Sequence, residues 1–211
     1  MARMEEIDDR LGGMNIDDEE NEEIFFEEGL EEVSNRFDLC VVGRFLTKKN
    51  INVRAMKSKL ADVWRPARGI NIKELKPGVF LFKFFHEDDM AWVLNGGPWS
   101  FDGAMLALGT VPQGEDPVSV PLNEIKVWIQ LHGLPAGFMT ESVGRKLGNF
   151  FGSFLLYDPN NDMSIWRESM RLRIVIDVRK PLKRKKKICK RDASECIIQC
   201  KYERLGDFCF I

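Results

Sequence analysis

The spacing of apolar residues between residues 37 and 111 is the feature that most constrains how this chain can fold. An apolar run at residues 37–45 is typical of a buried strand. Residues 52–64 place apolar side chains three and four positions apart, which predicts a helix, and Pro66 prevents its continuation. A strand followed by a helix is therefore expected at the start of this region.

The same region continues with a hairpin, a second helix and a last strand. Strands are predicted at residues 70–75 and 79–85, joined by a tight turn at Lys76-Pro77-Gly78. A helix is expected to begin near Glu87, followed by a fourth strand at residues 101–111. The order β-α-β-β-α-β is the split βαβ arrangement of ferredoxin-like and RNA-recognition (RRM) folds, whose sheet has one open face.

A second, smaller α+β unit is expected after a linker rich in proline. The pattern predicts a strand at residues 125–132, a helix at 140–151, and strands at 153–158 and 170–178. The predicted organisation is an α+β protein with a disordered acidic tail at 1–35, an RRM-like domain at 36–112, a linker at 113–121, a second unit at 122–208 and the start of a further motif at 209–211.

Charge is divided unevenly along the chain, although the formal net charge is only -2. Residues 1–35 contain 14 Asp or Glu against two Arg, a net charge of -12. Mutual repulsion opposes compaction there, so we expect a disordered interaction tail. Residues 36–211 carry the remaining 29 Lys or Arg against 19 acids, a net charge of +10. Such a body favours polyanionic partners, because each cation placed near a phosphate releases condensed counterions.

The sequence contains no apolar run of about 18 residues, and its first ten residues are charged where a signal peptide would be apolar. We therefore expect a protein of the nucleus or cytoplasm with no membrane partner. The five cysteines are an odd number, which makes a disulfide framework improbable.

The most basic segment follows the strand predicted at residues 170–178, and its expected partner is the phosphate backbone. A solvated strand end or a nuclear-localisation signal is the alternative interpretation. Lysine-rich contacts of this kind supply affinity without sequence choice. The candidate nucleic-acid-binding residues are Arg171, Arg173, Arg179, Lys180, Lys183, Arg184, Lys185, Lys186 and Lys187.

Phe80 and Phe82 are candidates for base stacking, because they share one face of a strand where an RNA-recognition domain presents aromatic rings. Burial beneath another element is the favoured alternative, since both faces of this strand are apolar. Trp99 and Trp128 are also expected in the core.

The sequence contains no recognisable catalytic motif and no complete set of metal ligands. The chain has no Cys-x-x-Cys pair, and Cys196 and Cys200 alternate along a predicted strand whose face is expected to be buried. Glycine-rich phosphate loops, nucleophile elbows and paired Cys-His motifs are also absent from the sequence. We therefore expect no enzymatic activity.

Several segments, taken together and in order, resemble a plant domain of unknown function, the 4283 family, which is found in LINE-type retroelement proteins. Residues 84–101 end in Gly96-Gly97-Pro98-Trp99-Ser100-Phe101, similar to the family's G-P-W-x-F segment. Residues 127–135 resemble its V-W-V-x-L-x-G-L-P, and Lys180-Pro181-Leu182 its K-P-L step. Residues 202–210 resemble the entry into a CCHC zinc knuckle, with Gly206 where the family usually has Pro.

The resemblance implies a nucleic-acid-binding protein, with RNA chaperoning or packaging ahead of a reverse transcriptase as its role. Cys209 would be the first ligand of the knuckle Cys-x2-Cys-x4-His-x4-Cys, and the sequence ends two residues later. We therefore expect an incomplete knuckle and no cofactor in this chain, with zinc only if a complete knuckle followed.

Two function hypotheses remain. In the first, the chain binds RNA or single-stranded DNA with low sequence specificity, and the acidic tail competes for the same surface, so that its deletion would tighten binding. In the alternative, the chain is a domesticated protein-protein interaction module, and the lysine run only directs nuclear import. The acidic tail is also a candidate site for a protein partner.

Overall fold

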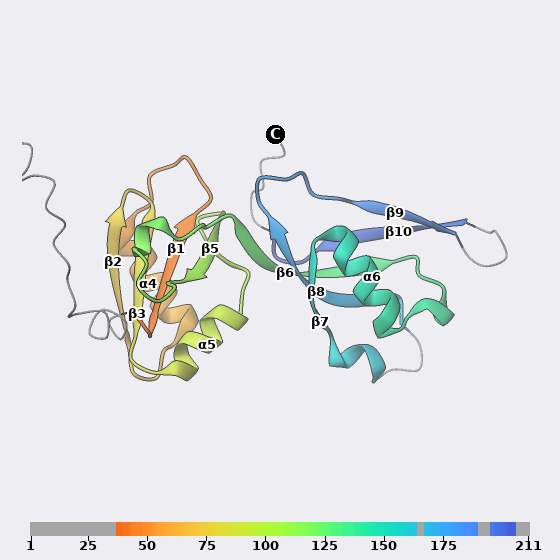
Figure 1. Cartoon of the computed structure of the whole chain (residues 1–211), viewed down its shortest axis with the longest axis horizontal. Helices are drawn as coiled ribbons and strands as arrows, with labels where there is room; N and C mark the ends of the chain where they lie inside the picture. Colours follow the sequence, from red (N-terminus) through yellow and green to blue (C-terminus); the bar gives the residue numbers. More distant parts are fainter. Residues whose placement is uncertain (1–36, 164–166, 190–194, 206–211) are drawn as a thin grey trace, which may run out of the picture.

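The computed structural model describes residues 37–163, 167–189 and 195–205, and the acidic tail lies outside them. The described residues form two antiparallel five-stranded sheets and three α-helices, arranged as two units side by side (Figure 1). The α+β class expected from the sequence is confirmed. None of the helices in these ranges is long and apolar enough to cross a membrane.

The first sheet has the strand order β2-β3-β1-β5-β4, so that β3 lies between β1 and β2. Residues that the sequence marks as apolar strands form it. Its strands are β1 (Cys40–Phe45), β2 (Ile70–Lys76), β3 (Val79–Phe84), β4 (Trp99–Phe101) and β5 (Ala104–Thr110).

The strand predicted at residues 101–111 is present as β5, but it begins only at Ala104, because the chain makes a hairpin just before it. Asp102 and Gly103 both have positive φ, 49° and 77°, and connect β4 to β5. Asp-Gly is a favoured pair for a two-residue hairpin turn, since both central residues must adopt φ > 0. The sheet therefore gains a fifth strand at its edge, in which Trp99 pairs with Leu106.

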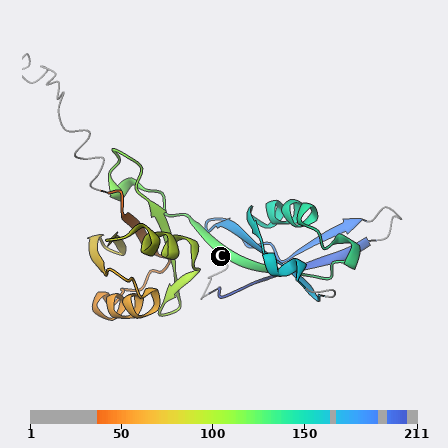
Figure 2. The same ribbon diagram turned by 90° about the horizontal axis from the view of Figure 1, so that it is seen from below.

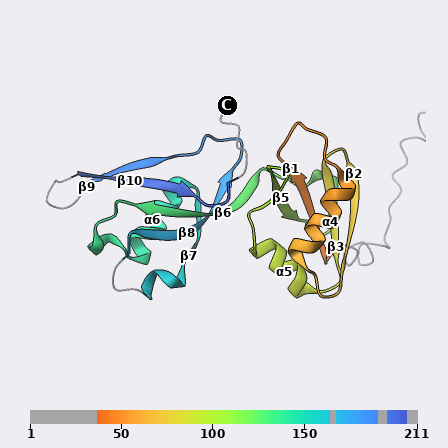
Figure 3. The same ribbon diagram turned by 180° about the vertical axis from the view of Figure 1, so that it is seen from behind.

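Two helices cover one face of this sheet, α4 (Val53–Trp64) and α5 (Glu87–Asn95) (Figure 3). Asn52 caps α4 by accepting from Ala55 N, and the chain turns away at Arg65, just before Pro66. The core beneath the helices includes Trp64, whose ring meets that of Phe82 edge to face at a centroid separation of 5.1 Å. Both helices agree with the expected positions.

The other face of the first sheet is covered by the segment expected to be a linker. Val120 and Leu122 are buried against Val42 and Ala107 of the sheet. Gly109 allows this close approach, because a Cβ there would lie 2.9 Å from Val120 Cγ1. The segment at residues 113–121 is thus packed structure in part, with a short 3-10 helix at Pro117–Ser119. The expected open face of this sheet is not free.

The second sheet has the order β7-β8-β6-β10-β9, with α6 (Glu141–Phe151) on one side (Figure 2). The strands predicted at residues 125–132, 153–158 and 170–178 are present, with small shifts of their ends. The last two strands form a ribbon that extends away from the first unit (Figure 1). The strands of the second sheet are β6 (Glu124–His132), β7 (Ser153–Tyr157), β8 (Ser169–Asp177), β9 (Lys185–Cys189) and β10 (Glu195–Tyr202). Two further 3-10 turns lie at Ala136–Phe138 and Pro159–Asp162.

Candidate nucleic-acid interface

The face of the second sheet opposite α6 is rich in polar, aromatic and cationic side chains. Along β6 and β8, buried apolar residues alternate with half-buried residues. The buried set, such as Leu172 and Ile129, belongs to the core under α6. Because successive side chains of a strand point to opposite faces, the half-buried set lines the other side of the sheet. We call this side the open face; from β6 and β8 it includes Lys126, Trp128, Gln130, Arg171 and Arg173.

Trp128 lies at the centre of this open face, and its expected place in the core is therefore wrong. Its indole ring carries the guanidinium of Arg171 at 3.8 Å from the ring centroid and that of Arg173 at 5.5 Å. Cation-π contacts of this kind favour a planar guanidinium lying over the ring. Trp99, by contrast, packs against Trp64 and donates from Nε1 to the carbonyl of Val93, as a core residue would.

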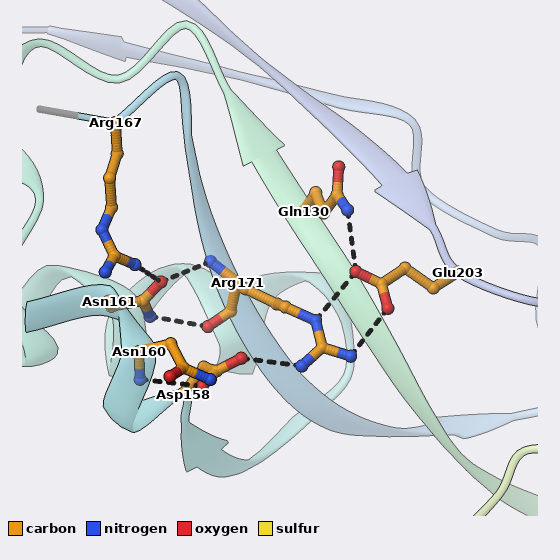
Figure 4. Close-up of polar contacts among 7 residues, drawn as sticks. All are labelled: Gln130, Asp158, Asn160, Asn161, Arg167, Arg171 and Glu203. Carbon is orange, nitrogen blue, oxygen red and sulfur yellow. Dashed lines mark hydrogen bonds and ion pairs between the residues drawn. The ribbon is translucent and has the colours of Figure 1, made fainter. Parts of the chain in front are cut away.

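Arg171 is held in place by two carboxylates (Figure 4). Its Nη1 donates to Asp158 Oδ2 at 2.7 Å. Its Nε and Nη2 donate to the two carboxylate oxygens of Glu203 at 2.9 and 2.8 Å. Gln130 also donates to Glu203. Such bidentate pairing fixes the plane of a guanidinium, so the Arg171 group has one defined orientation on the sheet.

This arrangement lowers the pKa of both carboxyl groups. Hydrogen bonds from Arg171 lower the pKa of Glu203. Burial raises the pKa of Asp158, but hydrogen bonds from Arg171 and from the backbone of Asn160 outweigh it, and the net shift is downward. Both acids are therefore held in their charged form by the fold.

This pairing predicts a loss of stability in acid. Because the folded-state pKa of both acids is below the unfolded value, their contribution is complete above the unfolded pKa and is lost as pH falls through the folded pKa. We expect the melting temperature to fall from about pH 5 downward. Melting followed by circular dichroism from pH 7 to pH 3 measures this, and the fall should be smaller in Arg171→Leu, which has no pairing to lose. Equal pH profiles for both proteins would contradict the assignment.

Arg173 and Lys126 connect the open face to the first unit. Lys126 Nζ donates to the carbonyl of Leu94 at 3.2 Å, and the Arg173 guanidinium donates to the carbonyls of Asn95 and Gly96. These carbonyls stand at the end of α5, where backbone acceptors lack helical partners and the helix dipole favours cations. Desolvation by burial lowers the pKa of both cations. They thus serve to join the two units.

The prediction that Arg171 and Arg173 contact phosphates is therefore not supported by the arrangement of their side chains. The charge of Arg171 is compensated by two carboxylates, and Arg173 is directed at backbone carbonyls. A strand pattern alone places both residues on the same face, but it does not show which partners approach that face.

The cations beyond β8 are distributed over two surfaces. Arg179 makes a paired contact with Asp177, which also lies 3.7 Å from Lys180. Asp177 consequently has a pKa well below its usual range, chiefly because Arg179 donates to it. Lys183 and Lys186 lie over the ring of Phe150 on the α6 side, at 4.5 and 4.3 Å from its centroid.

The edge strand β9 extends the open face. Its residues Lys185 and Lys187 pair with Gln199 and Ile197 of β10, whereas the intervening Lys186 pairs with the buried Ile198. Lys185 and Lys187 therefore lie on the open-face side, and Lys187 contacts Glu195. We call the exposed cations of residues 180–187 the basic edge; they lie along β9 and the segment before it, and Lys183 faces the α6 side: Lys180, Lys183, Arg184, Lys185 and Lys187.

The structure does not offer Phe80 and Phe82 for base stacking. Both side chains are fully buried, in the core between the sheet and its helices. The alternative expectation of burial is confirmed, because the third strand places these rings on the helix side. The surface that an RNA-recognition fold would use lies on the opposite side and is covered by residues 117–122.

The described cysteines do not form a metal site. Burial raises the pKa of Cys200 to about 12, and it raises the pKa of Cys40 as well. Since zinc binds the thiolate, both are poor ligands where they stand. No group of three or more His, Cys, Asp or Glu in the described ranges is arranged to hold a metal. Cys209, the expected first knuckle ligand, lies outside those ranges.

Comparison with protein families agrees with the order of segments along the chain. Residues 33–118 match the family model of a domain of unknown function, DUF4283. Residues 176–211 match the family model of a zinc knuckle. The second match begins at the end of β8 and includes the basic edge and β10. A search of curated proteins found no match.

Proposed function

We propose that this protein binds RNA or single-stranded DNA without catalysing a reaction, since residues 33–118 match the DUF4283 family model and residues 176–211 match a zinc knuckle. Zinc knuckles are among the common modules that bind single-stranded nucleic acid. The observation that carries the proposal is the basic edge, five exposed cations within the part that matches the knuckle family. Their contacts go to phosphates, which gives low sequence specificity.

In this proposal the first unit supports the second unit and does not itself bind nucleic acid. Its strand order places β3 between β1 and β2, with β5 beyond β1, which supports a relationship to RNA-recognition folds. The face that such folds use for RNA is covered by Val120 and Leu122. Nucleic acid is therefore bound by the second unit, and the first unit is joined to it through Arg173 and Lys126.

The origin and location of the protein are further parts of the proposal. A LINE-type retroelement origin, a plant source and a nuclear location follow from the family resemblance and the lysine run. Genomic sequence downstream of codon 211 tests the origin: we expect the remaining knuckle ligands and a polymerase reading frame there. Unrelated sequence would argue for a different origin.

The salt dependence of binding tests the function itself. Fluorescence anisotropy of the whole chain with a labelled single-stranded RNA should give a line of log affinity against log salt with a slope of about -2 to -4. This slope follows from three to five phosphate contacts at roughly 0.7 each. A protein-protein interaction module, the alternative, would show no affinity for RNA even at low salt. Absence of binding at about 0.02 M salt would therefore overturn the proposal.

A further inference from the structure

The second unit also contains a recess, beside Arg171, that does not suit a phosphate group. We propose that one unpaired nucleobase stacks on the guanidinium of Arg171, in the recess beside it. The inference rests on the proposed function and adds a base-binding site to it. Sequence-independent contacts at the basic edge would then be supplemented by a site that requires a free base.

The Arg171 guanidinium is organised as a rigid platform. Asp158 and Glu203 occupy hydrogen-bonding positions around the edge of the plane, at distances of 2.7 to 2.9 Å. The indole of Trp128 stacks against the plane at 3.8 Å. Arg171 nevertheless keeps 35% of its side-chain surface exposed. A planar cation held in this way can stack on a base without first losing conformational freedom.

A recess of about 490 Å³ adjoins this platform. Arg171 lines it together with Gln130 of β6 and Ser169 of β8. Its volume falls within the range of small-molecule sites. Asn160 (Figure 4) supplies an amide and Ser169 a hydroxyl group to the lining, and both can meet the edge of a base.

The charge of the recess favours a base over a phosphate. The two cations lining it, Arg167 and Arg171, are offset by Asp158 and Glu168 in the lining and by Glu203 against Arg171. A phosphate would have to approach these carboxylates, which carry like charge. A neutral planar group meets no such repulsion. RNA-binding proteins commonly stack unpaired bases on arginine planes as well as on aromatic rings.

The test compares two single strands of equal length and charge, oligothymidylate and an oligomer of abasic phosphodiester units. The whole chain should bind the thymidylate about tenfold more tightly, since stacking one base contributes roughly a factor of 5 to 150. Arg171→Lys keeps the charge but removes the planar group, so the preference should vanish while affinity for the abasic strand stays unchanged. Anisotropy titrations measure all four values.

A second variant tests the same recess independently, in case Arg171→Lys does not fold. Ser169→Leu fills the rim of the recess with an aliphatic side chain that cannot stack on a base, and it leaves the Arg171 ion pairs in place, so it should also abolish the preference. Lys146→Gln, an exposed cation on α6, serves as the control and should keep it. Equal wild-type affinity for both strands would overturn the inference, and so would a preference retained in both variants. If the wild type bound neither strand, the proposed function would fail instead.

Discussion

Replacing Arg171 by leucine is expected to lower the free energy of unfolding by about 2 kcal/mol, less than the roughly 3 to 5 kcal/mol of a fully buried charge pair, because the Arg171 side chain stays 35% exposed to screening solvent. The Asp158 side chain is only 5% exposed and would lose its ion pair, while Glu203 would lose both bonds from the guanidinium. Urea denaturation at pH 7, followed by tryptophan fluorescence, measures the change.

Arg145→Leu is the matched control for this variant. Arg145 forms an ion pair with Glu141 four residues earlier on α6, and both side chains are 59% exposed. Exposed pairs contribute at most about 1 kcal/mol, so this variant should be close to the wild type. If Arg171→Leu cost no more than Arg145→Leu, the network around Arg171 would not stabilise the second unit.

Neutralising the basic edge is expected to weaken nucleic-acid binding on the order of a hundredfold at about 0.1 M salt. The variant replaces Lys183, Arg184, Lys185 and Lys187 with Gln. Four lost phosphate contacts reduce the slope of log affinity against log salt by about three units, at roughly 0.7 per contact for a single strand. Stability should change little, since exposed substitutions usually have small effects.

A control variant removes the same amount of charge from the first unit. Lys49, Arg54, Lys57 and Lys59 are exposed on α4 and the loop before it, and replacing them with Gln changes the net charge equally. This variant should alter the slope by less than one unit. A loss as large as that of the basic-edge variant would mean that binding follows net charge and has no particular place on the protein.

Much of the fold could be predicted from the sequence because local signals determine it. The apolar spacing over residues 52–64, the break at Pro66 and the helix start near Glu87 mark the helix ends close to where the structure has them. The Asp102-Gly103 turn was also a local signal, but the apolar run on both sides made one long strand the simpler interpretation. The resemblance to the 4283 domain family followed by the entry into a zinc knuckle, carried by several motifs in order, is confirmed by the family comparisons.

The candidate site was predicted less well, because its chemistry depends on contacts between distant residues. Alternation along β8 places Arg171 on one face of its strand, and alternation along β6 does the same for Trp128, but neither pattern shows that these faces lie on the same side of the sheet. Asp158 and Glu203, which neutralise Arg171, are 13 and 32 residues away from it. The packing of Val120 on the first sheet could not be predicted from the sequence either, because a proline-rich segment has the composition of a linker whether or not it packs.

The central claim is that nucleic acid lies on the second unit, along the basic edge and the open face. Photo-crosslinking of the whole chain to a 4-thiouridine RNA, followed by mass spectrometry of the linked peptides, tests it most directly. We predict crosslinks within residues 180–189 and around Trp128. Crosslinks confined to the first unit, at residues 37–111, would contradict the account.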